Sequence, residues 1–192
     1  MTEFQTFYHL GLEHILDKNG YDHIIFVIAL CALYQPEDWK QVLVLVTSFT
    51  FGHSITLALS TLSIVNVSSD LVEFLIPITI FITAFANLFT KPYGNRVSIR
   101  NYVFAGCFGL IHGLGFSNYL KSLLGKDESI VTQLFAFNIG LEVGQILIVA
   151  VFLAITFLVV GLLNVSQRDW KMTISSAVAG IALVLIIESN YL

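Results

Sequence analysis

Charged residues are scarce in this sequence. Asp, Glu, Lys and Arg make up 11% of its 192 residues, hydrophobic residues make up 56%, and the net charge is −4. Soluble domains contain about 25% charged residues, so this composition excludes an ordinary soluble domain. The lack of a basic arm or patch argues against nucleic acid as a partner. The composition therefore predicts a multi-pass membrane protein in contact with lipid, with residues 1–192 forming one integral membrane domain.

Several chemical signatures are also missing. The two cysteines, Cys31 and Cys107, lie in apolar segments, so we expect neither a disulfide nor a redox motif. The first residues do not show a basic segment followed by an apolar run, which predicts that there is no cleavable signal peptide. HExxH, GxSxG, P-loop and GxGxxG motifs do not occur, so nothing supports a standard metalloprotease, esterase or nucleotide-binding site.

Long apolar segments predict an all-α membrane bundle. We expect six transmembrane helices, preceded within residues 1–17 by a short amphipathic or re-entrant helix. The six spans are expected at about 22–35, 39–62, 70–89, 100–124, 130–163 and 170–189. The first is short for a bilayer, and the fifth is longer than a bilayer needs, so the fifth should be tilted, extended or broken. Turn residues at 91–96 and a polar stretch at 125–128 separate neighbouring spans.

Basic residues are unequally shared between the two sides of this predicted bundle. The loops after the first, third and fifth spans hold Lys40, Lys91, Arg96, Arg100, Arg168 and Lys171, whereas the other side holds Lys18, Lys121 and Lys126. Loops rich in Lys and Arg stay in the cytoplasm. This pattern predicts that both termini lie outside, in the periplasm if the cell has an outer membrane, with the protein in the cell (inner) membrane.

His112 stands among glycines in the middle of an apolar segment. A titratable ring at membrane depth is costly, so such a residue is a functional-site hypothesis by default. Gly109 and Gly113 have the small-residue spacing that lets two helices approach closely. The alternative is that the glycines only pack and that His112 makes an interhelical hydrogen bond.

Three further polar groups interrupt the apolar segments. Asn138, Glu142 and Gln145 share one face of a predicted helix, and a carboxylate there needs a cation, a proton or hydrogen-bond donors. His53 lies among hydroxyls that include Thr50 and Ser54, although such hydroxyls often bond back to their own helix. Asp22 and His23 start the first span, where Asp22 could be a ligand, a neighbour of a ligand, or only a helix cap.

Taken together, these groups suggest a metal site. Imidazole and carboxylate ligands suit first-row divalent cations such as Ni²⁺ or Zn²⁺ better than Ca²⁺ or Mg²⁺. The candidate ligands are His14, His23, His53, His112, Asp22 and Glu142, and the supporting polar residues are Thr50, Ser54, Glu73, Asn138 and Gln145. From the predicted topology, the ligands should converge on one layer that opens toward the outside.

Four segments resemble the HupE/UreJ family of membrane proteins, whose members include nickel permeases. The matching segments cover residues 11–16 with 20–23, then 49–57, 110–116 and 137–142, in the order of the family. The resemblance implies that His14, Asp22, His23, His53 and His112 bind the metal or line its path. The chain departs from the family's pattern in having more residues between His14 and Asp22, so His14 is the weakest assignment.

The favoured function is binding of a divalent transition metal in an outward-facing intramembrane site, for uptake of the nickel type. One alternative is an intramembrane zinc-dependent hydrolase, in which three histidines hold the metal and Asp22 or Glu142 serves as general base. A second alternative is an accessory membrane subunit without metal, whose histidines make interhelical bonds. The oligomeric state stays open, with a homo-oligomer among the possibilities.

Overall fold

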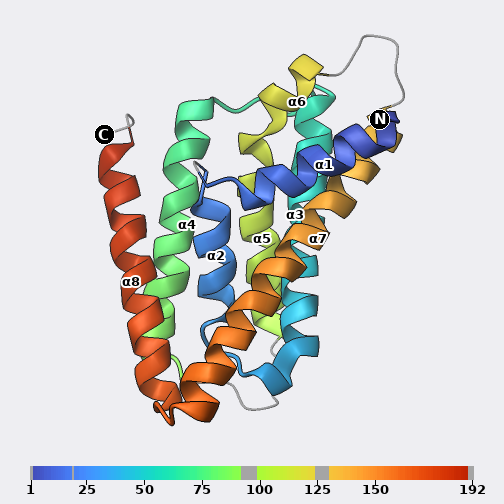
Figure 1. Ribbon diagram of the computed structural model, residues 1–192. Coiled ribbons are helices and arrows are strands. Elements are labelled where there is room, and N and C mark those ends of the chain that lie inside the picture. Colours follow the sequence, from blue (N-terminus) through green and yellow to red (C-terminus); the bar gives the residue numbers. More distant parts are fainter. Residues whose placement is uncertain (1, 19, 92–98, 124–129, 190–192) are drawn as a thin grey trace.

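The computed structural model describes residues 2–18, 20–91, 99–123 and 130–189, and the regular structure in these ranges is helical (Figure 1). The elements in chain order are α1 (Glu3–Leu16), α2 (Asp22–Cys31), the 3-10 turn η1 (Pro36–Asp38), α3 (Trp39–Thr61), α4 (Ser69–Phe89), α5 (Ile99–Gly115), α6 (Ser117–Leu123), α7 (Ile130–Thr156), the π-helical turn η2 (Phe157–Leu162) and α8 (Gln167–Glu188). The prediction of an all-α bundle is confirmed. The predicted connections at 92–96 and 125–128 lie outside the described residues.

Four helical segments in the described ranges are long and apolar enough to cross a membrane. They are Pro36–Thr61, Ser69–Phe89, Ile130–Leu162 and Gln167–Glu188. The structure does not confirm six spans. The first predicted span contains only the ten-residue α2, which is about 15 Å long against a hydrocarbon core of about 30 Å. The fourth is divided, because α5 ends at Gly115 and α6 begins at Ser117.

The predicted N-terminal helix is present and packs across α7. Thr2 and Gln5 form a capping box, in which the Thr2 hydroxyl accepts from the Gln5 amide and the Gln5 side chain accepts from the Thr2 amide. A Cβ on Gly11 would lie 2.0 Å from the Phe137 carbonyl oxygen, and a Cβ on Gly140 would lie 2.0 Å from the Tyr8 oxygen. The two backbones therefore touch where each helix carries a glycine, and α1 is held against the bundle by α7.

The long fifth predicted span is α7 with its π-helical end. Figure 1 shows α7 running obliquely across the bundle, from the end near α1 and α6 to the opposite end. Among the three forms predicted for this span, tilted, extended or broken, the oblique course relative to the other helices agrees with the first. Its far end is tied to α8, because the Trp170 indole N–H donates to the Thr156 hydroxyl over 3.0 Å.

A second close helix pair joins α3 and α5. A Cβ on Gly52 would lie 2.0 Å from the Gly106 oxygen, and one on Gly109 would lie 2.1 Å from the Phe49 oxygen. A Cβ on Gly113 would lie 2.2 Å from the His53 carbonyl oxygen. The predicted packing role of Gly109 and Gly113 is therefore confirmed, and their partner is the helix that carries His53.

Basic side chains gather at one end of the bundle. In the described ranges, Lys40, Lys91, Arg100, Arg168 and Lys171 lie at helix ends opposite α6, and Lys18 and Lys121 lie at the end that carries α6 (Figure 1). Lys171 is buried there. Its ammonium group donates to the Leu88 and Thr90 carbonyls and so caps the C-terminal end of α4. The start of α1 and the end of α8 share the α6 end (Figure 1).

Candidate metal centre

Three histidines from three different helices meet below the α6 end. Each of His14 (α1), His23 (α2) and His53 (α3) offers a ring nitrogen, and these nitrogens all lie within 4.8 Å of one another. The ring centroids of His14 and His23 are 4.6 Å apart, and that of His53 lies 6.0 and 6.2 Å from them. We call these three residues the histidine cluster. The structure therefore brings His14, the weakest of the sequence assignments, next to the other two.

The two glycine-mediated helix pairs hold this cluster in position. His14 lies one turn after Gly11, where α1 contacts α7, and His53 follows Gly52, where α3 contacts α5. His23 is in the first turn of α2. Because each ligand comes from a separate element, the cluster depends on the packing between helices and not on any local sequence motif.

The histidine cluster leaves several buried nitrogen atoms without a partner. They are His14 Nε2, His23 Nε2 and both ring nitrogens of His53, which is completely buried. A buried polar atom without a hydrogen bond costs free energy, so unpaired groups that converge need a common explanation. A divalent cation that accepts electron pairs from all three rings fits this donor set.

His112 lies beside the cluster but outside it. Its ring centroid is 5.3 Å from that of His23, and its Nε2 is 3.1 Å from the Thr79 hydroxyl of α4. Its Nδ1 has no partner. The interhelical hydrogen bond considered from the sequence is therefore present. Thr79 was missed, although its spacing from Thr83 places two hydroxyls on one face of α4 and could have signalled it.

Asp22 contacts His23 and does not cap α2. Its Oδ1 lies 3.2 Å from His23 Nδ1, which makes an ion pair when the imidazole is protonated. The N-cap of α2 is Tyr21, without a side-chain hydrogen bond, so the helix-cap alternative for Asp22 is wrong. A carboxylate on Nδ1 holds the proton there and turns the unpaired Nε2 toward the cluster, which is how outer carboxylates orient histidine ligands of metals.

Replacing Asp22 by asparagine should therefore weaken metal binding without removing it. The loss of such an outer partner lowers metal affinity by about 10–100-fold, and Asn cannot accept the Nδ1 proton as strongly as a carboxylate. Titration of the purified protein with Ni²⁺ measures this effect. Asp70→Asn is the matched control, because Asp70 is an exposed acidic residue in the first turn of α4. An unchanged affinity in Asp22→Asn would contradict the orienting role.

Glu142 belongs to a different polar contact, between α3 and α7. The Thr47 hydroxyl donates to Glu142 Oε1 over 2.5 Å, and the Thr50 hydroxyl donates to Gln145 Oε1 over 2.8 Å. Thr47 precedes His53 by six residues, or about 9 Å along the helix. The structure thus does not join Glu142 to the histidine cluster.

The remaining supporting residues have different surroundings. Ser54 donates to the Thr50 carbonyl of its own helix, which is the back-bonding alternative considered from the sequence. Asn138 Oδ1 is buried and has no partner. Glu73 is exposed and lines a cavity next to the histidines.

This cavity, here called the histidine cavity, has a volume of about 930 Å³. His14, His23 and His112 line it, together with the aromatic rings of Phe116 and Tyr119. Its other polar side chains are Glu13, Asp17, Asp22, Glu73 and Lys18. With four carboxylates and one ammonium group, the cavity attracts cations toward the histidines.

Comparison with known proteins gives one match. A family model described as "HupE / UreJ protein" matches residues 1–189. No curated protein and no solved structure matches the chain. The family match covers nearly the whole sequence, including each of the segments that carried the resemblance, and it agrees with the apolar helices of the fold. The chain belongs to the HupE/UreJ family of membrane proteins.

Proposed function

We propose that this protein takes up a divalent transition-metal ion, with nickel as the expected cargo, and that the histidine cluster is its binding site. The observation that carries the proposal is the convergence of His14, His23 and His53, whose unpaired nitrogens lie within 4.8 Å of one another. Imidazole nitrogen is a preferred ligand of Ni²⁺ and Zn²⁺. Nickel is chosen because the family includes nickel permeases.

The direction of movement follows from the charge distribution. Five of the basic residues in the described ranges lie at the end opposite α6, and this end is expected in the cytoplasm. The histidine cavity would then open to the outside, where its carboxylates collect the cation and the cluster replaces part of the water shell. Uptake needs binding weak enough to release, which suits three neutral ligands without a directly bound carboxylate.

The hydrolase alternative has less support from the geometry. A zinc hydrolase needs a free carboxylate close to the metal-bound water. Of the two carboxylates considered as general base, Asp22 is engaged with His23 and Glu142 with Thr47 on another face of α3, so the role would fall to another carboxylate of the histidine cavity, such as Glu73. We therefore favour transport, and the alternative becomes one outcome of the experiment.

Proteoliposomes test the proposal directly. The purified protein is reconstituted in vesicles that enclose a Ni²⁺-sensitive dye, and Ni²⁺ is added outside. We expect saturable accumulation that protein-free vesicles lack. Binding of Ni²⁺ without accumulation would overturn the transport proposal, and zinc-dependent cleavage of vesicle lipid would favour the hydrolase.

A further inference from the structure

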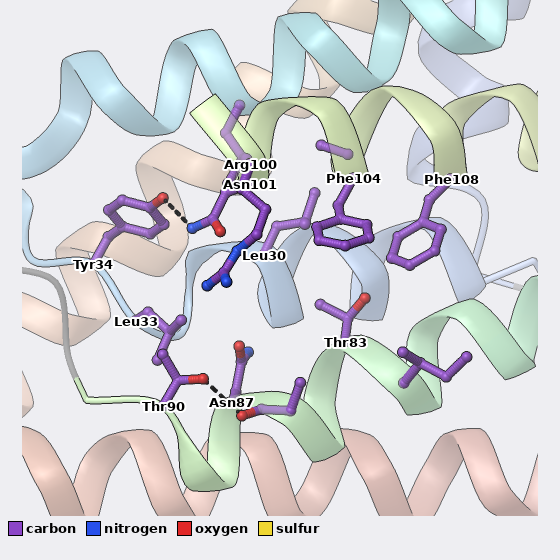
Figure 2. A pocket seen from close by; sticks show the side chains of 14 residues that line it. Leu30, Leu33, Tyr34, Thr83, Asn87, Thr90, Arg100, Asn101, Phe104 and Phe108 are labelled. Atoms are coloured by element: carbon purple, nitrogen blue, oxygen red, sulfur yellow. Dashed lines mark hydrogen bonds between the residues drawn. The ribbon is translucent and has the colours of Figure 1, made fainter. Parts of the chain in front are cut away.

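A second cavity lies on the other side of the histidine cluster. We call it the asparagine cavity; it has a volume of about 340 Å³ and is lined by parts of α2, α3, α4 and α5. Figure 2 shows Phe104 and Phe108 at one end of this cavity, with Tyr34 and Thr90 toward the other. Asn87, Asn101 and Arg100 add polar groups on the side away from the phenylalanines (Figure 2).

The two cavities are close to each other along shared helices. In α5, His112 lines the histidine cavity and Phe108 lines the asparagine cavity, four residues or about 6 Å apart. In α2, the corresponding residues are His23 and Leu30, about 10 Å apart. Little more than one layer of side chains fits between the cavities.

Two aromatic rings are part of that layer. Phe26 of α2 and Phe49 of α3 are 0% and 1% exposed, and their ring centroids are 5.1 Å apart. On one side they contact His112, at 4.8 and 5.1 Å between centroids. On the other side Phe26 contacts Phe108, at 6.0 Å.

We propose that Phe26 and Phe49 form the closed inner gate of the transport path, and that the asparagine cavity receives the ion when these two rings move apart. This inference rests on the proposed transport function. A hydrated cation cannot cross two buried phenyl rings without losing its water, so the closed layer is a barrier of the kind that apolar constrictions provide in channels.

The surrounding groups fit an inner exit. The barrier is little more than one layer of side chains, so the proposed opening needs movement of side chains and not of whole helices. Arg100 is exposed at the polar end of the asparagine cavity (Figure 2), and its positive charge shortens the stay of a cation there whichever way the ion leaves.

Cysteine labelling tests the gate without relying on metal transport. In a background with Cys31→Ala and Cys107→Ser, a reporter cysteine is placed either at Glu73, in the histidine cavity, or at Thr83, in the asparagine cavity. A membrane-impermeant methanethiosulfonate is added to one side of the proteoliposomes. We expect Glu73→Cys and Thr83→Cys to react from opposite sides. Reaction of both from the same side would overturn the gate.

Removal of the rings should then join the two cavities. In Phe26→Ala/Phe49→Ala, reagent added on the Glu73 side should modify Thr83→Cys, on the order of tenfold faster than in the parent. Phe51→Ala is the control, because Phe51 is in the same helix and 70% exposed. No acceleration in the double variant would contradict the proposal. If that variant does not fold, Phe26→Leu takes its place, because leucine is apolar but smaller. We expect a smaller acceleration of Thr83→Cys modification in Phe26→Leu. No acceleration there would contradict the gate equally.

Metal flux separates failure of the gate from failure of the transport function. Vesicles loaded with Ni²⁺ should leak faster through Phe26→Ala than through the parent protein, on the order of tenfold. One outcome is that Phe26→Ala/Phe49→Ala connects the two cavities in the labelling assay while neither the parent nor the variants carry Ni²⁺. That result would refute nickel transport but would still support the two rings as the barrier between the cavities. Ni²⁺ uptake by the parent with no effect of Phe26→Ala would support transport and refute the gate.

Discussion

Replacing His53 by alanine is expected to lower the affinity for Ni²⁺ by more than about 100-fold. The loss of an outer partner of a metal ligand already costs about 10–100-fold, and His53 would be a direct ligand. Both of its nitrogens are buried without a hydrogen bond, so no other role in the described structure accounts for them. Without the His53 ring, His14 and His23 remain in the cluster, and two ligands cannot enclose a cation by themselves.

Titration calorimetry on the purified protein measures this loss, and the thermal transition of the metal-free protein reports on folding. His9→Ala is the matched control. It removes a histidine from the same helix as His14, but its side chain is exposed and outside the cluster. Ni²⁺ binding that is equal in His53→Ala and His9→Ala would show that the cluster does not bind the metal.

The second large effect is expected on folding stability, when alanine replaces a glycine at a close contact between two helices. In Gly52→Ala the new Cβ would lie 2.0 Å from the Gly106 oxygen, and in Gly140→Ala it would lie 2.0 Å from the Tyr8 oxygen. Overpacking of a core costs about 1–3 kcal/mol when side chains can move aside. Here the obstacle is backbone, so we expect a loss at or above the upper end of that range, with the helix pair forced apart.

Gly180→Ala is the control for this experiment, because nothing lies within 4 Å of a Cβ at that position. Alanine favours a helix over glycine by about 1 kcal/mol, so this variant should be as stable as the parent or more stable. Thermal unfolding in detergent, followed by size-exclusion chromatography, compares the three variants. Equal stability of Gly52→Ala and Gly180→Ala would show that the α3–α5 contact tolerates separation.

Hydrophobic pattern predicted which segments are helical, and small residues predicted one of the close contacts. Pattern could not predict where helices stop inside an apolar segment. The apolar run continues through Ala32, Leu33 and Tyr34, yet α2 ends at Cys31, where the Asn87 side-chain amide donates to the Ala29 oxygen over 2.7 Å. Beyond the division after Gly115, the Ser60 hydroxyl of α3 donates to the Ser117 hydroxyl of α6, a contact between residues far apart in the sequence.

The chemistry of the site was more predictable than its geometry. Residue types alone identified the imidazoles, because ionisable rings are rare in apolar segments. Which rings share a cation depends on helix rotation and depth. A shift of a few residues along α3 separates Glu142, at the level of Thr47, from His53. The position of His14 depends on the contact between α1 and α7. The number of residues between His14 and Asp22 does not predict that contact.

That dependence on α7 has a consequence for biosynthesis. His14 leaves the ribosome well before the helix that holds α1 in place, because that helix contains Phe137 and Gly140. A nascent chain therefore inserts α2 and α3 with only two of the three ligands in position. Premature capture of a metal ion during insertion is disfavoured, and the site is completed only when α1 docks on α7, which is made after α2 and α3.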